Sequence, residues 1–186
     1  MPSRLHLAGE GSGLARPRAG FGVYTREILH AMSVDRPDCR FTVYLPPDAP
    51  SPNPAPAIGY RPMPSLPFVG RHIQWPARMR RLRPDAYFGP AGVLPLGSVG
   101  CASVITIHDL AIYLNPGWFP GRQPLSTREV RQRSLARSEL SIAVSNNTSA
   151  AGRALVGVPA APLHLGPSGV SHVLTASGRG HRAGAR

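Results

Sequence analysis

The segment between residues 104 and 119 constrains the fold most, because a β-branched run stops there at two polar residues. The run is Val104–Ile107, His108 and Asp109 follow it directly, and a loop containing Trp118 comes next. A short apolar run of this kind is typical of a buried strand. Since ligands bind outside the carboxyl ends of strands in open α/β sheets, the segment predicts a strand that delivers polar groups to a ligand-binding edge.

Candidate strands and helices alternate along the rest of the chain. Short apolar runs predict strands at 5–8, 40–45, 57–60, 86–88, 104–107 and 140–144. Helical spacing and stop signals predict helices at 23–32, 70–82 and 124–138, and a further helix to 155 that Ser145 or Asn147 caps. This alternation predicts an α/β fold with a Rossmann-like parallel sheet and helices on both faces.

The length of 186 residues suits one core and a tail. We assign residues 1–167 to a single Rossmann-like domain and residues 168–186 to a linker remnant and a Gly/Arg tail, disordered at 177–186. That tail has no periodicity able to bury a face. Prolines crowd between residues 46 and 67, which predicts a loop there around the strand at 57–60.

The net charge of +12 is weak support for a polyanionic partner, because all 21 basic residues are arginine and none is lysine, which indicates compositional bias. A nucleic-acid partner therefore ranks last.

Cys39 and Cys101 have no partner at metal-ligand spacing, so we expect no metal and a reducing, cytoplasmic setting. The uncharged run at 91–108 contains Pro95 and three glycines, so any membrane contact is expected to be peripheral.

Two glycines precede the first helix. Gly20 and Gly22 would let the backbone approach an anion, and the unpaired amides of a first helical turn favour negative charge. An ordinary tight turn explains the pair equally well. The dinucleotide fingerprint lacks its third glycine, so NAD is not predicted.

Other candidate features have both a structural and a functional interpretation. For Trp118 and Phe119 we favour packing of the loop onto the sheet over an acceptor surface. For Asp109 we favour bonds to nearby backbone amides that shape the loop. A solvated helix face is preferred over binding of anionic lipid for the cluster Arg78, Arg80, Arg81 and Arg83.

Four blocks of the sequence, in order, resemble the family 4 glycosyltransferases, which build two Rossmann-like domains around a cleft (the GT-B fold). The blocks are residues 18–29 with the glycine pair, residues 82–91, the His-Asp segment, and residues 141–148 with 156–159. The resemblance implies transfer of a sugar with retention, from a nucleotide-sugar donor to a sugar, lipid or polysaccharide acceptor, without metal or other cofactor. It places His108 in the cleft as the catalytic candidate, with Gly20, Phe21, Gly22 and Asp109 as substrate-binding candidates.

The same resemblance implies that this chain is the N-terminal, acceptor-side half. The family's arginine, lysine and glutamate for the leaving diphosphate belong to a second domain, whereas this chain has no lysine and has Ser171 where the family usually shows aspartate. We therefore expect a chain that is inactive alone and needs the C-terminal domain or a partner chain. The expected location is the cytoplasm, with contact at the inner face of the membrane. The alternative is a non-catalytic α/β module that binds a phosphate-bearing ligand or a protein.

Overall fold

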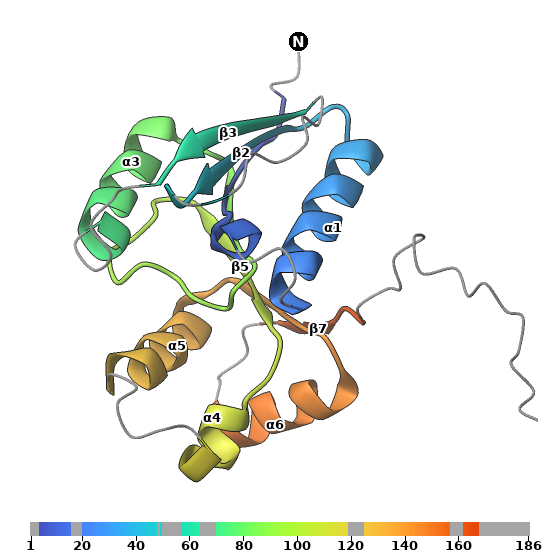
Figure 1. Cartoon of the computed structure of the whole chain (residues 1–186), viewed down its shortest axis with the longest axis vertical. Coiled ribbons are helices and arrows are strands. Elements are labelled where there is room, and N and C mark those ends of the chain that lie inside the picture. The colour runs from blue at the N-terminus through green and yellow to red at the C-terminus, as the bar shows by residue number, and fades with distance from the viewer. Residues whose placement is uncertain are drawn as a thin grey trace, which may run out of the picture.

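A computed structural model describes residues 4–15, 20–47, 49, 57–63, 70–118, 125–156 and 162–167. Within these residues, seven strands form one sheet in the order β3-β2-β1-β4-β5-β6-β7, and every neighbouring pair is parallel (Figure 1). The strands are β1 His6–Glu10, β2 Arg40–Leu45, β3 Ile58–Pro62, β4 Ala86–Gly89, β5 Ala102–Ile107, β6 Leu140–Ala143 and β7 Leu163–Leu165. The Rossmann-like parallel sheet predicted from the sequence is confirmed.

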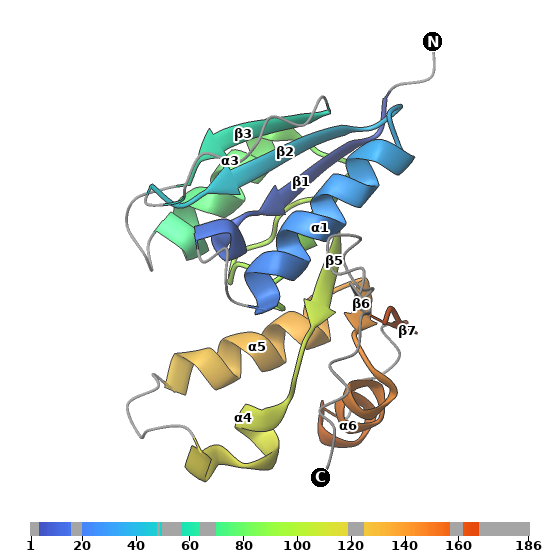
Figure 2. The ribbon, with the colours of Figure 1, turned by 45° about the vertical axis from the view of Figure 1, so that its right-hand side comes forward.

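Helices cover both faces of this sheet, as predicted. The helices are α1 Gly20–Asp35, α3 Trp75–Leu82, α4 Ala111–Leu114, α5 Leu125–Arg137 and α6 Asn146–Val156, with single turns η1 Ser12–Ala15, η2 Gly70–Gln74 and η3 Pro116–Trp118. In Figure 2, α1 lies in front of β1, and α3 lies behind β2 and β3. The first turn of α1 and the end of β5 lie side by side in this view.

Two apolar clusters, one on each face, hold the layers together. Trp75 and Met79 of α3, Ile105 of β5 and Leu135 of α5 belong to one cluster, and Leu29 of α1 packs with Val43 and Phe88 in the other. Alternate residues of a strand point to opposite faces. β5 therefore supplies Ile105 and Ile107 to the first cluster and Val104 to the second, which anchors the strand that carries the site.

The element boundaries differ from the prediction at two places near the site. α1 begins at Gly20 instead of residue 23, so Gly20 and Gly22 lie in the first helical turn and not in a preceding loop. The hydroxyl of Thr25 donates to the carbonyl of Phe21 at 2.7 Å within this early turn. The segment after Asp109 was predicted as a long loop, but it contains the one-turn helix α4.

Stop signals and caps elsewhere act as predicted. Arg83 closes α3 in the left-handed conformation, with φ 50°, immediately before Pro84. Ser145 caps α6, because its hydroxyl accepts the amide of Thr148 at 3.1 Å. The predicted disordered tail at 177–186 lies outside the described residues, as does much of the proline-rich loop.

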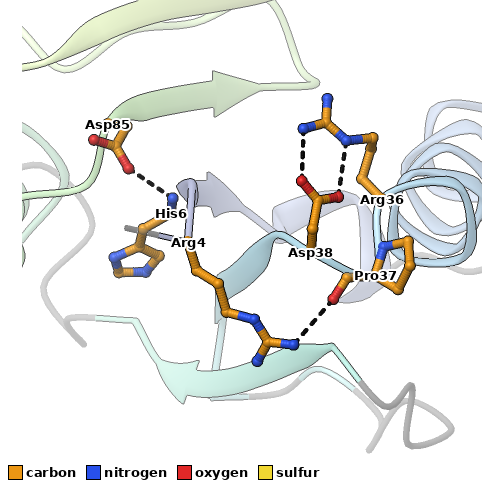
Figure 3. A network of polar contacts seen from close by, with 6 residues as sticks. All are labelled: Arg4, His6, Arg36, Pro37, Asp38 and Asp85. Atoms are coloured by element: carbon orange, nitrogen blue, oxygen red, sulfur yellow. Dashed lines mark hydrogen bonds and ion pairs between the residues drawn. The ribbon is translucent and has the colours of Figure 1, made fainter. Parts of the chain in front are cut away.

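A polar network ties the amino ends of the strands together, at the edge opposite to the site (Figure 3). The carboxylate of Asp85 accepts the main-chain amide of His6 at 2.7 Å. The guanidinium of Arg40 lies 2.8 Å from Nδ1 of His6, so Nδ1 accepts, and Nε2 donates to the hydroxyl of Thr42 at 2.9 Å. His6 is therefore held as the neutral imidazole.

This network predicts a loss of stability on mild acidification. Burial and the charge of Arg40 hold the pKa of His6 below its ordinary value of 6.5, so the unfolded chain binds the proton more readily. The stabilisation is complete above the unfolded pKa and is lost as the pH falls through the folded pKa. Urea unfolding between about pH 8 and pH 5 should show this loss in the wild type and less of it in His6→Gln. Identical pH profiles would show that His6 is not the group responsible.

Candidate functional site

A cavity of about 200 Å³ lies at the carboxyl end of β5. It lies where parallel strands of an open sheet present their ligand sites. Five parts of the fold contribute to its wall. They are the first turn of α1 with Phe21, the turn after β4 with Gly92, the end of β5 with His108 and Asp109, α4 with Tyr113, and α5 with Arg131. The structure thus brings three of the predicted site residues, Phe21, His108 and Asp109, to one cavity.

The ring of His108 is fixed from two sides. Its Nε2 lies 2.8 Å from the carbonyl oxygen of Pro90, and because a carbonyl can only accept, Nε2 carries the hydrogen. The ring of Tyr24 meets the imidazole edge-on, with the two centroids 4.8 Å apart. Nδ1 has no hydrogen-bond partner within the described part of the chain. In the neutral ring it can accept a hydrogen bond from a ligand hydroxyl.

Tyr24 helps to position His108. The sequence did not reveal this role. Its hydroxyl lies 3.0 Å from Oγ1 of Thr106, which precedes His108 by two residues and faces the same side of the sheet. Burial raises the pKa of Tyr24, so its hydroxyl stays protonated at neutral pH. In the sequence Tyr24 reads only as one apolar position on a helical stripe, which gives no sign of a polar partner on another element.

The two predicted glycines lie near the cavity without lining it. Gly22 is buried in the first turn of α1, and a Cβ built on Gly20 would meet no atom within 4 Å. Close packing therefore does not explain why residue 20 is a glycine. Asp109 has the loop-shaping contact that we expected, since its Oδ1 accepts the amide of Ala111 at 3.0 Å and begins α4.

Gly92 is a further cavity residue that sequence reasoning missed. Its amide donates to the carbonyl of Gly89 at 3.1 Å in the turn after β4. Its φ is +72°, and a Cβ there would lie 2.8 Å from the carbonyl oxygen of Thr106. The turn therefore needs glycine for both its conformation and its close approach to β5.

Replacing Gly92 by alanine should lower the free energy of unfolding by about 1–3 kcal/mol, because the positive φ strains any residue with a Cβ, and contact with Thr106 adds to the strain. The matched control is Gly20→Ala, which adds the same methyl group in open space within a helix. That change should raise stability by up to about 1 kcal/mol. Chemical unfolding of both variants checks the opposite signs, and a neutral Gly92→Ala would contradict the argument.

Of two predictions about the surface, the structure agrees with one and contradicts the other. The four arginines on and after α3 are all exposed, as expected, and Arg78 donates to the carbonyl of Pro62 at 3.0 Å. The packing predicted for Trp118 is wrong, since 74% of this residue is exposed. The reason is that α4 and η3 extend beyond the end of the sheet (Figure 2). Phe119 lies outside the described residues.

The described residues contain no group of three or more His, Cys, Asp or Glu side chains arranged to hold a metal ion. Among the helices in the described part, none has the length and apolar character needed to cross a membrane. The two cysteines, Cys39 and Cys101, are both free.

Two plant proteins of known structure share this fold. Over 88% of this chain, Arabidopsis thaliana UGT89C1 in complex with UDP-L-rhamnose aligns with a TM-score of 0.55 and 12% identity. Over 89%, Glycyrrhiza uralensis UGT73P12 in complex with glycyrrhetinic acid 3-O-monoglucuronide aligns with a TM-score of 0.50 and 11% identity. The matched regions cover 52% and 48% of those chains, so this chain spans about half their length.

Comparison of sequences gives the family. No curated protein matches the chain significantly. Residues 19–173, however, match Glycosyltransferase Family 4, and this range contains the cavity and every predicted site residue. The chain therefore belongs to glycosyltransferase family 4.

Proposed function

We propose that this chain is the acceptor-side half of a glycosyltransferase that transfers a sugar, with retention, from a nucleotide-sugar donor to a sugar, lipid or polysaccharide acceptor. The observation that carries this proposal is the arrangement of His108. Its ring is held by Pro90 and Tyr24, and its Nδ1 is left for a ligand at the cavity on the carboxyl edge of the sheet. Membership of the family supports the reaction class.

The proposed site divides its tasks among three residues. Nδ1 of His108 accepts a hydrogen bond from a hydroxyl of the acceptor or of the transferring sugar. The half-buried ring of Phe21 offers an apolar surface to the carbon-bound hydrogens of a sugar. Asp109 orders the start of α4 and so positions the loop that follows His108.

We propose further that the described domain does not turn over a nucleotide sugar by itself. Departure of a nucleoside diphosphate needs cations or donors on the developing charge, and one such group is worth about 10²–10³ in kcat. A second lobe or a partner chain would supply these groups and close the cavity. Release of UDP from UDP-glucose in proportion to the amount of purified chain would contradict this part of the proposal.

Binding of a neutral sugar tests the acceptor role directly. Titration of the isotopically labelled chain with methyl glucoside should shift the amide resonances of Phe21, Gly92 and His108 before those of residues at the amino edge, such as His6. The reason is that the cavity lies at the carboxyl edge, whereas His6 lies at the opposite edge. Shifts confined to the amino edge, or the absence of shifts with a panel of methyl glycosides, would contradict it.

A further inference from the structure

We propose that Arg131 makes this cavity selective for a sugar that carries an anionic oxygen group, either phosphate or carboxylate. The inference rests on the proposed acceptor role of the cavity and specifies the class of acceptor. Nothing in the sequence distinguishes Arg131 from the other arginines, of which the chain has 21 in all. Its placement in the fold supplies that reason.

Arg131 lies on α5 and lines the cavity together with His108. Its Nε is buried and has no hydrogen-bond partner within the described part of the chain. A buried donor left unpaired costs about 1–3 kcal/mol. The guanidinium makes no hydrogen bond or ion pair with another described residue, so a ligand oxygen that displaces the atoms covering Nε and accepts from it would remove that cost.

The surroundings of Arg131 leave its charge available. The ion pairs found among the described residues are Arg26–Glu27 and Arg36–Asp38, and both lie outside the cavity. Asp109 is the acidic residue that lines the cavity, and its Oδ1 accepts the amide of Ala111. No ion pair joins Asp109 to Arg131 in the described structure. The positive charge of Arg131 is therefore not neutralised by a carboxylate of the cavity wall.

A second arginine, the exposed Arg128, contacts Tyr113, which lines the cavity. Arg128 lies one turn earlier on α5, and its guanidinium carbon is 5.2 Å from the ring centroid of Tyr113. The hydroxyl of Tyr113 donates to the carbonyl of Arg128 at 2.7 Å, which holds the two residues together. Because a guanidinium matches two oxygens of a phosphate or carboxylate at once, Arg131 is suited to oxyanions more than to neutral hydroxyls.

Two residues of the cavity wall therefore recognise different groups. His108 offers a nitrogen that accepts from a hydroxyl, and Arg131 offers donors to an anion. A ligand that satisfies both carries a hydroxyl and a phosphate or carboxylate on one small molecule. A phosphorylated sugar and a uronic acid both meet this description.

Titration with three matched probes tests the proposal: glucose, glucose 6-phosphate and glucuronate, each followed by amide shifts of the cavity residues. At physiological ionic strength, where the Debye length is about 8 Å, the wild type should bind at least one anionic probe about tenfold more tightly than glucose. Arg131→Gln should lose this preference. The matched control is Arg133→Gln, which removes the same charge from an exposed position on the same helix and should keep the preference. The anionic probe whose affinity exceeds that of glucose by the larger factor shows whether the cavity prefers phosphate or carboxylate.

Any other result of these titrations contradicts either the role of Arg131 or the acceptor role of the cavity. Equal binding of glucose and both anionic probes, or equal losses in the two variants, would overturn the role of Arg131 and leave the acceptor site standing. Absence of cavity shifts with every probe would overturn the acceptor role as well. If Arg131→Gln does not fold, Arg131→Lys serves, because it keeps the charge but not the planar pair of donors. It should lower the preference several-fold, and an unchanged preference would overturn the proposal.

Discussion

Replacing Ile105 by alanine should lower the free energy of unfolding by about 2–5 kcal/mol, the range for removing a large buried aliphatic side chain. Ile105 is 0% exposed and belongs to the cluster that joins β5 to α3 and α5. The strand lies between β4 and β6, so the surrounding backbone is held on both sides by the sheet and cannot collapse fully into the vacated space.

The matched control is Ile73→Ala, which removes the same atoms from a side chain that is 62% exposed. We expect this change to alter stability by less than about 0.5 kcal/mol. Urea unfolding of the two variants, followed by far-ultraviolet circular dichroism, measures both values. Similar losses at the two positions would show that the cluster around Ile105 is not the centre of the core.

The strands could be predicted because their signal is local. The runs at β2 and β5 are short, apolar and rich in β-branched or aromatic residues, and buried strands of a parallel sheet need little else. The strand β3 was also found, although its bounds shifted from 57–60 to 58–62. Helix α4 was missed because four residues carry no helical period. Its single turn follows the contact between the carboxylate of Asp109 and the amide of Ala111, at the point where the chain leaves the sheet.

The site was predicted in part, for a similar reason. His108 and Asp109 could be located because they end a recognisable strand, and the structure places Phe21 beside them. Tyr24 and Gly92 depend on contacts with Thr106 from other elements, 82 residues away in the case of Tyr24. The exposure of Trp118 could not be inferred, because an apolar residue in a loop gives no indication of whether the loop reaches the sheet.

Removing the imidazole of His108 should weaken the binding of methyl glucoside by about tenfold. One hydrogen bond contributes about 0.5–1.5 kcal/mol, and tenfold corresponds to the upper part of that range. His108→Ala also takes away the ring that contacts Tyr24, so the cavity wall itself is opened. His108→Asn should recover part of the loss, since its amide can donate to the carbonyl of Pro90 while its oxygen accepts from the ligand.

His30→Ala provides the matched control, because it removes an imidazole from an exposed position of α1 that does not line the cavity. Its affinity for methyl glucoside should equal that of the wild type within error. The comparison separates the two interpretations of the fold that the sequence left open. A glycosyltransferase acceptor site requires a polar group aimed at the ligand, so His108→Ala must bind more weakly than His30→Ala. A non-catalytic module that uses the same edge only as a scaffold would bind equally in both variants, and that result would remove the observation on which the proposed function depends.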